Sequence, residues 1–263
     1  MSFQLQGEGP QIYETVLVPL WFGRWAEALV GTLDLAADAR VLDIACGTGV
    51  TTRMVHDALG PEGHVVGLDN NEGMLVTAAE LAEGRDIRWI HADVTGSGLP
   101  SGSFDVILSQ HGYHYFPDKP AALREFRRLL SPGGAMVFSI WAGHSAYTEA
   151  LCDAVATHIS AEAAAMQRAQ RETPTAEALE RAVRDAGFEA VLVTRQKLEI
   201  DVPAPETFVP QHLQSMPIAG AFLALPEDRR AALVASVAAA MADHIEGDRM
   251  TYADAVHVVS GRG

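Results

Sequence analysis

The segment VLDIACGTG, residues 41–49, indicates the type of fold, because an apolar run ends there in a turn that contains two glycines. A helical pattern follows over 49–59. Gly47 and Gly49 have no Cβ atom, so the backbone can turn tightly and a ligand can lie against it. The helix after the turn directs free N–H groups and its positive end toward the same place. The segment therefore predicts a strand, a turn and a helix that together hold a ligand.

The alternation of apolar runs and helical patterns continues along the chain after this turn. Short apolar runs between helical patterns are typical of parallel strands that are covered on both faces. The pattern predicts an α/β fold with a Rossmann-like, doubly wound sheet. Strands are expected over 41–45, 64–69, 86–91, 104–109 and 135–141, with helices over 49–59, 71–83 and 118–130.

The two ends of the chain add helices and further strands to this sheet. Residues 11–34 have helical recurrence, and we expect Pro19 to divide them into two short helices. We expect seven strands in all, the last antiparallel, with a helical cap inserted between the last two. After residue 141 the pattern predicts helices over 145–170 and 175–188, a strand over 190–200, a helical pair over 205–246 and a strand over 251–260.

The length of the chain favours a single domain over residues 1–263, because it is long for one average domain and short for two. Residues 1–36 are expected to supply N-terminal helices, and 37–142 the ligand-binding half. Residues 143–263 are expected to supply the cap and the C-terminal strands. The cap is too small and too rich in alanine for a core of its own, so we expect it to close over the sheet.

Asp69 ends the strand after the glycine turn, 22 residues beyond Gly47. An acidic residue at this place in an α/β sheet accepts hydrogen bonds from both ribose hydroxyls of a nucleotide. An isolated aspartate could equally be a turn residue or a helix N-cap. Its combination with the glycines and with Asp43 inside the preceding strand favours a nucleoside ligand. A dinucleotide is disfavoured, because Thr52 stands where its fingerprint has a third glycine.

The segment VLDIACGTG resembles motif I of the class I methyltransferases that depend on S-adenosylmethionine (SAM). The chain is most similar to the methyltransferase type 11 group, which is related to quinone-biosynthesis C-methyltransferases. The resemblance covers about residues 40–142. Four further segments match the family in register: GLDNNEGML (67–75), HADVTGSGLP (91–100), FDVILSQHGYHYFPD (104–118) and EFRRLLSPGGAMVFSIW (125–141).

This resemblance implies SAM as the cofactor and assigns residues to its parts. SAM carries a sulfonium cation, an amino acid, a diol and an exocyclic amine, which suit an acidic, glycine-rich crevice at strand ends. The family pattern places Asp43, Gly47 and Gly49 at the methionine end, with Thr48 in the same turn, and Asp69 at the ribose hydroxyls. It places Asn70 and Met74 beside ribose and adenine, Asp93 and Val94 at the adenine, and Ser109 and Gln110 near the methionine amine and the methyl group.

The loop QHGYHYF, residues 110–116, supplies the candidate catalytic residues His111 and His114. Histidine has the right intrinsic pKa for acid–base work near neutrality, although such residues also serve as packing. A general base is needed only where the acceptor atom carries a proton. Tyr13, Trp21 and His144 could line the acceptor pocket. We expect no metal, because no third ligand stands at the required spacing from the two histidines.

The composition excludes several classes of partner. A formal net charge of −15 repels phosphate backbones and anionic lipid surfaces, so we expect neither a nucleic acid nor a membrane as partner. Arg124, Arg127 and Arg128 have the spacing of a solvated helix face. The start MSFQLQGEGP does not look like a signal peptide, and no apolar run reaches the ~18 residues that span a bilayer. With two cysteines far apart in sequence, we expect a cytoplasmic protein.

These features predict a methyltransferase that transfers the methyl group of SAM to a small, partly apolar acceptor at oxygen, nitrogen or carbon. Three alternatives stay open: a cyclase or decarboxylase that keeps SAM, a non-catalytic binding module on the same fold, and an NAD-dependent oxidoreductase. The sequence does not identify the acceptor, the methylated atom or the oligomeric state.

Overall fold

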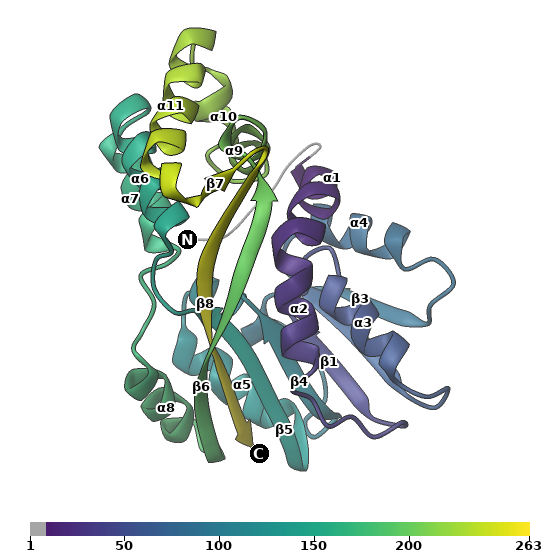
Figure 1. The fold of residues 1–263 in the computed structure, drawn as a ribbon. Coiled ribbons are helices and arrows are strands. Elements are labelled where there is room, and N and C mark those ends of the chain that lie inside the picture. Colours follow the sequence, from purple (N-terminus) through teal and green to yellow (C-terminus); the bar gives the residue numbers. More distant parts are fainter. Residues whose placement is uncertain (1–8) are drawn as a thin grey trace.

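A single mixed sheet forms the centre of the molecule (Figure 1). The computed structural model describes residues 9–263. Residues 1–8 lie outside the described residues; they belong to the predicted N-terminal segment 1–36 and to the start MSFQLQGEGP. The strand order is β3-β2-β1-β4-β5-β8-β6, and β7 pairs with β8. The strands are β1 (Arg40–Ile44), β2 (His64–Asp69), β3 (Ile87–His91), β4 (Phe104–Gln110), β5 (Leu130–Trp141), β6 (Glu189–Pro203), β7 (Ile245–Glu246) and β8 (Arg249–Arg262).

The first five strands are parallel, whereas β8 runs antiparallel between β5 and β6. This confirms the predicted Rossmann-like, doubly wound sheet with an antiparallel last strand. The short β7 is an addition that the sequence did not predict. Strand β5 also begins at Leu130 rather than at residue 135, because Leu130 already pairs with Phe104 before the turn at Pro132.

Helices α3 (Val50–Ala58), α4 (Glu72–Leu81) and α5 (Lys119–Leu129) connect the parallel strands. Asn71 and Asp118 begin α4 and α5 by accepting the backbone N–H of Met74 and Ala121, respectively. The short 3₁₀ turns η2 (Val94–Gly96) and η3 (Tyr113–Tyr115) follow β3 and β4. The boundaries of all three helices agree with the predicted helices to within two residues at each end.

The N-terminal helices form one continuous rod rather than two separate helices. Helix α1 (Gly9–Ile12) leads into a π-helix, η1 (Tyr13–Phe22), which leads directly into α2 (Gly23–Val30). Pro19 lies inside η1, so the predicted break at this residue is wrong. In an α-helix the proline ring clashes with the carbonyl four residues earlier, and the wider π turn relieves that clash.

The cap lies beyond one end of the sheet (Figure 1). It contains the predicted insertion between β6 and β8, which consists of three helices and a 3₁₀ turn rather than two helices. Two helices that follow β5 pack on it, and Ser160 caps the second of them, so the predicted helix 145–170 is divided. The helices are α6 (Ala146–His158), α7 (Ala161–Ala169), α9 (Pro205–Gln214), α10 (Ala219–Leu223), α11 (Glu227–Ala240) and η4 (Ala242–His244); α8 (Ala176–Asp185) packs on β6.

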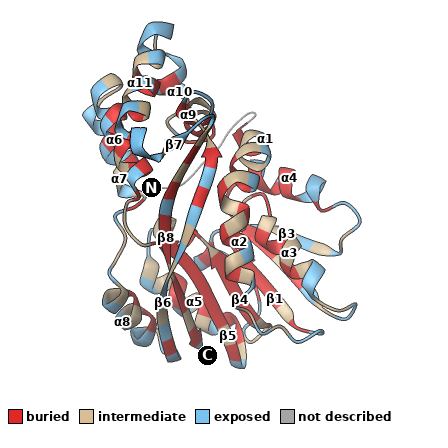
Figure 2. Cartoon of the chain, in the orientation of Figure 1, coloured by how far each residue is buried: buried red, intermediate tan, exposed pale blue. Residues whose placement is uncertain are grey.

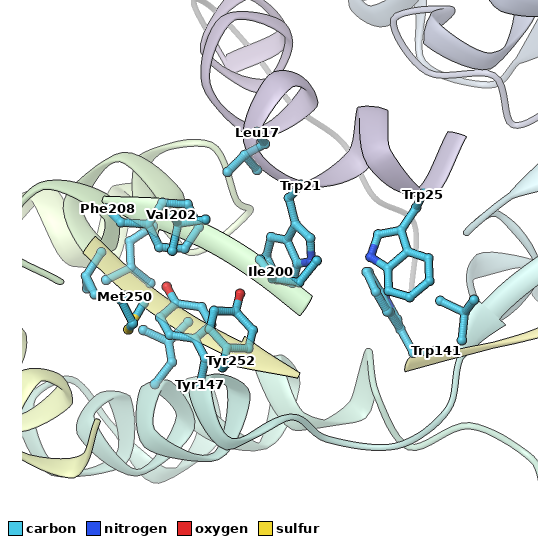
Figure 3. Packing of buried hydrophobic residues seen from close by; sticks show 14 of the residues in the cluster. Leu17, Trp21, Trp25, Trp141, Tyr147, Ile200, Val202, Phe208, Met250 and Tyr252 are labelled. Carbon is cyan, nitrogen blue, oxygen red and sulfur yellow. The ribbon is translucent and has the colours of Figure 1, made fainter. Parts of the chain in front are cut away.

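The N-terminal rod, the sheet and the cap share a continuous hydrophobic core. Buried residues follow the strands and the inner faces of the helices, and exposed residues cover the outer faces (Figure 2). Trp21 and Trp25 descend from the rod toward Trp141 at the end of β5, and Tyr147 of α6 stacks on Tyr252 of β8 (Figure 3). This shared core fixes the cap and the rod over the carboxyl edge of the sheet. Within residues 9–263, no helix combines the length and the apolar character needed to cross a bilayer.

Candidate active site

A cavity with about 1220 Å³ of space between its walls lies at the carboxyl ends of β1, β2, β3 and β4. Strand order reverses between β1 and β4, and ligands of open α/β sheets bind at such a switch point. The cavity continues from this edge to the rod and the cap. Its sheet end is lined by Ala45, Gly47, Asp69, Asn70, Met74, Asp93 and Val94, and its cap end by Trp21, Phe22, Trp141, Gln167, Arg171, His212 and Met216.

The glycine turn brings the backbone of Gly47 to the wall of the cavity. Ala45, Gly47 and Gly49 all have positive φ angles, of 57°, 55° and 78°. An added Cβ atom at Gly47 would meet no atom within 4 Å, so this wall is open to a ligand. At Gly49 the ring atom Cη2 of Trp89 lies 2.5 Å from the Cβ position. Gly49 is therefore required by packing and by its φ angle, and it does not line the cavity.

Trp89 of β3 also lies over Gly67 of β2, where an added Cβ atom would overlap its ring. The substitution G67A is expected to lower the free energy of unfolding by about 1–3 kcal/mol, because the ring must shift in a packed interior. Urea denaturation measures the change. G67A in a W89L background is expected to cost less, and G96A, whose Cβ would meet nothing within 4 Å, is the control. An equal loss in both backgrounds would contradict the assignment to Trp89.

The carboxylate of Asp69 binds the backbone of the glycine turn. Its Oδ2 accepts the backbone N–H of Gly47 and its Oδ1 accepts that of Asn71, both at 2.8 Å. The residue is 8% exposed, and burial raises the pKa of its carboxyl. The backbone N–H of Asn70 also donates to this carboxylate, and Asp69 lines the cavity. Three backbone N–H groups thus hold the predicted ribose residue at the cavity wall.

Asp93 and Val94 mark the opposite side of the sheet end of the cavity. Oδ1 of Asp93 accepts the backbone N–H and the hydroxyl of Thr95, at 2.8 and 2.6 Å, which begins η2. Val94 is buried against this wall. The structure brings nine of the predicted site residues into the lining of one cavity: Gly47, Asp69, Asn70, Met74, Asp93, Val94, Gln110, His111 and His114.

The other four predicted residues, Asp43, Thr48, Gly49 and Ser109, do not line the cavity. Asp43 is 1% exposed, and its Oδ2 accepts the hydroxyl of Thr52 at 2.6 Å. Burial raises the pKa of the Asp43 carboxyl to about 7. Ser109 is fully buried beneath the turn at Gly112. In this structure the side chains of Asp43, Thr48 and Ser109 support the turn from behind, and the roles of all four residues beside the cofactor stay predictions. The pairing with Asp43 also explains why Thr52 replaces a third glycine.

Two side chains fasten the N-terminal rod to the glycine turn. Glu14 accepts hydrogen bonds from the hydroxyl of Thr48 and from the guanidinium of Arg53, both at 2.5 Å. Gln110, at the end of β4, donates its amide N–H to the carbonyl of Phe22 at 2.8 Å and accepts the hydroxyl of Thr51. No sequence pattern predicts these contacts. They hold the π-helix against the cavity, and π-helices are frequent at functional sites.

His111 and His114 both line the cavity, between its two ends. His111 has a φ of 55° and stacks on Trp141, with ring centroids 3.9 Å apart and an interplanar angle of 17°. Burial lowers its pKa well below the usual range. Burial and the nearby charges of Arg171 and Lys119 lower the pKa of His114 to about 3. Both imidazoles are therefore neutral at pH 7, and their ring nitrogens are buried without a protein partner.

Arg171, in the segment after α7, is a site residue that the sequence analysis missed. It binds both carboxylate oxygens of Asp254 on β8, at 2.8 and 2.9 Å, and the two side chains are 5% and 2% exposed. Its guanidinium carbon lies 3.7 Å from the ring centroid of Trp141. No sequence motif connects residues so far apart in the chain. The pair is recognised only in the folded structure, where both side chains are buried together.

Further aromatic side chains complete the cap end of the cavity. His212 accepts or donates a hydrogen bond with the hydroxyl of Tyr147 at 2.8 Å, and burial lowers the pKa of His212 to about 3. The predicted pocket residues Tyr13 and Trp21 do line the cavity. His144 does not; it lies beside Glu149 on α6. Flat, apolar walls with few polar groups suit a small organic ligand.

Cysteine and metal chemistry find no support in residues 9–263. Cys46 and Cys152 are both buried and free. Cys46 lies against Gly67 behind the glycine turn, where it packs as a small residue. The described residues contain no group of three histidine, cysteine or carboxylate side chains arranged to hold a metal ion.

Comparison with known sequences identifies the sheet half of the chain. Residues 41–134 match the model of a methyltransferase domain family. Demethylmenaquinone methyltransferase of Listeria welshimeri is 34% identical over 116 residues, which are 43% of this chain and 49% of that protein. The enzyme of the same name from Staphylococcus epidermidis is 33% identical over 114 residues, 43% of this chain and 47% of that protein. The chain thus spans about half the length of the curated relatives it matches.

Solved structures extend the likeness in fold to almost the whole chain. Phosphoethanolamine N-methyltransferase 2 of Haemonchus contortus, solved with S-adenosylhomocysteine, has a TM-score of 0.63 and 17% identity, over 97% of this chain and 56% of that one. The YcgJ protein of Bacillus subtilis has a TM-score of 0.61 and 18% identity, over 91% and 98%. The [4+2]-cyclase SpnF has a TM-score of 0.53 and 21% identity, over 91% and 79%. Residues 41–134 are therefore similar to a methyltransferase domain, and the whole chain shares the fold of the solved methyltransferase structures.

Proposed function

We propose that this protein transfers the methyl group of SAM to a small, partly apolar organic acceptor. The observation that carries the proposal is that one cavity joins the sheet edge, with the residues suited to SAM, to an aromatic cap end suited to an acceptor. Residues of the cap and of the rod line the far end of this cavity, which favours a small acceptor over a macromolecular one. The relatives that are named methyltransferases support the same reaction.

The residues at the sheet end fit the polar groups of SAM. Asp69, which lines the cavity, would accept the ribose hydroxyls, and the open wall at Gly47 leaves room for the methionine end. Asp93 would accept the adenine amine, while Val94 and Met74 would pack on the adenosine. Asn70 lines the same wall. Gln110 is bound to Phe22 and Thr51, so its part is to fix the rod beside the methionine end.

Alignment and exclusion of water are the contributions we assign to the protein in the reaction. SAM, when bound, supplies an activated methyl group and a neutral leaving group. The side chains of Phe22, Trp141 and His111, which line the cavity, would position a planar acceptor for in-line displacement, and such alignment supplies a large part of the rate. His111 and His114, both neutral, would bind the oxygen or nitrogen of the acceptor as hydrogen-bond partners. With so low a pKa, His114 is a weak base.

Turnover assays separate this function from the alternatives on the same fold. Incubation with SAM and a panel of planar phenols, enols and amines is expected to yield S-adenosylhomocysteine (SAH) in equal amount to a methylated product, both measured by mass spectrometry. A variant without the ribose carboxylate, D69A, is the control and is expected to yield neither. Conversion of an acceptor while SAM stays intact would contradict methyl transfer and would favour a cyclase or decarboxylase.

A further inference from the structure

The ion pair of Arg171 and Asp254 gives the cap end of the cavity a defined electrostatic polarity. Arg171 lines the cavity, whereas Asp254 does not, so the pair presents its positive end to a ligand. The pair is almost completely buried, and screening by water and salt is weak there. Arg171 also lies over Trp141, whose ring forms part of the wall.

No other charge on the described wall of the cap end opposes Arg171. Among the described residues, the carboxylates that line the cavity are Asp69 and Asp93, and both belong to the sheet end. The imidazoles of His111, His114 and His212 line the space between, and burial together with Arg171 lowers the pKa of each, so all three are uncharged at pH 7. A cationic acceptor at the cap end would thus face the positive charge of Arg171, and no carboxylate on the described wall there would neutralise the acceptor's own charge.

Unpaired polar atoms point to oxygen on the acceptor. The indole N–H of Trp21 is buried without a protein acceptor, and Trp21 lines the cavity. Both ring nitrogens of His111, a residue that is 93% buried, also have no protein partner. A buried donor without a partner is unfavourable, and an acceptor oxygen in the cavity would satisfy it.

We propose, on the basis of the proposed function, that the cap end binds a planar conjugated acceptor as its oxyanion, a phenolate or an enolate, and that Arg171 selects this charge. The indole N–H of Trp21 and an imidazole N–H of His111 or His114 donate to the oxyanion. The aromatic side chains of Phe22 and Trp141, which line the cavity, contact its ring. Amines and quaternary ammonium compounds are rejected.

The charge of such an acceptor also suits the reaction. An electron pair of the oxyanion, at oxygen or at the conjugated carbon, forms the bond to the methyl carbon, while the pair of the breaking C–S bond stays on sulfur. The cationic cofactor and the anionic acceptor thereby become two neutral products, and no proton moves in this step. A buried, water-poor site favours such a loss of charge, so neither histidine has to remove a proton during methyl transfer.

Calorimetric titration of SAH-loaded protein with two planar probes tests this proposal. 2,4-Dinitrophenol is a phenolate at neutral pH, and 2,4-dinitroaniline has the same shape without the charge. The phenolate is expected to bind at least about tenfold more tightly, and benzylammonium is expected to show no saturable binding. Equal affinity for the two planar probes, or tight binding of benzylammonium, would overturn the proposal.

Substitutions locate the preference at Arg171. In R171Q/D254N, which removes both charges of the pair, the two planar probes are expected to bind within about twofold of each other. R171K keeps the charge and is expected to keep the preference, which provides a second variant if the double variant does not fold. R168Q is the matched control, because Arg168 of α7 pairs with Glu149 and Asp153 and does not line the cavity. If R171Q/D254N still preferred the phenolate, residues other than Arg171 would cause the preference, and the proposed role of Arg171 would be overturned.

The titration of the protein with SAH itself separates this inference from the proposed function. Saturable SAH binding without a preference for the phenolate would contradict the inference and leave methyl transfer standing. Absence of SAH binding would contradict the proposed function. The same probe titrations on the protein without SAH then still measure the charge preference of the cap end.

Discussion

Replacing Asp69 by alanine is expected to weaken the binding of SAH about 100-fold. Two hydrogen bonds from the ribose hydroxyls to a charged, largely buried acceptor are lost, each contributing about 1.5–3 kcal/mol before non-additivity. The substitution also releases the backbone N–H groups of Gly47 and Asn71 that Asp69 holds in place. Isothermal titration calorimetry with SAH measures the dissociation constants of the variant and of the unmodified protein.

The control for this prediction is D57N. Asp57 lies on α3, is exposed, and pairs with Arg85 rather than with the glycine turn. Its substitution is expected to leave the SAH affinity within about twofold of the starting value, because an exposed ion pair contributes little and lies outside the cavity. If D69A also bound SAH within about threefold of the unmodified protein, Asp69 would not be the ribose residue.

Replacing Arg171 by methionine is expected to lower the free energy of unfolding by about 3–5 kcal/mol. The substitution leaves the carboxylate of Asp254, which is 2% exposed, without its counter-ion in the interior. The loss of the contact with Trp141 adds to the effect. Urea denaturation followed by circular dichroism, with the slope checked for two-state behaviour, gives the value.

A second substitution at the partner tests the cause of this loss. In R171M/D254L both charges are gone, and most of the lost stability is expected to return, because the cost of a buried unpaired carboxylate disappears. The control is R184M, which breaks the exposed pair of Arg184 and Glu180 on α8 and is expected to cost under about 0.5 kcal/mol. If R171M lost no more free energy of unfolding than R184M, the buried pair would stabilise the protein no more than an exposed pair does.

The sheet and the glycine turn were predictable because their signals are local. Each buried strand is an apolar run, as in Val41 and Leu42, which are both fully buried in β1. Asp69 could be found because an acid at a strand end has a definite spacing from a glycine turn. The same locality explains why the predicted helix boundaries of α3, α4 and α5 agree closely with the structure.

The rest of the site depends on contacts between distant parts of the chain. Glu14 reaches Thr48 across 34 residues, and Arg171 reaches Asp254 across 83, and neither contact leaves a periodic pattern. The π-helix around Pro19 was missed because proline predicts a break wherever an α-helix is assumed. Local sequence thus predicts the cofactor end of the cavity better than its acceptor end.

Parallel calorimetric titrations of the purified protein with SAM, SAH and NAD test whether the cavity binds SAM. We expect saturable binding of one molecule of SAM or SAH per chain and no measurable heat from NAD. Binding of NAD alone, or of none of the three, would contradict the assignment of the cavity at the carboxyl edge of the sheet as a SAM site.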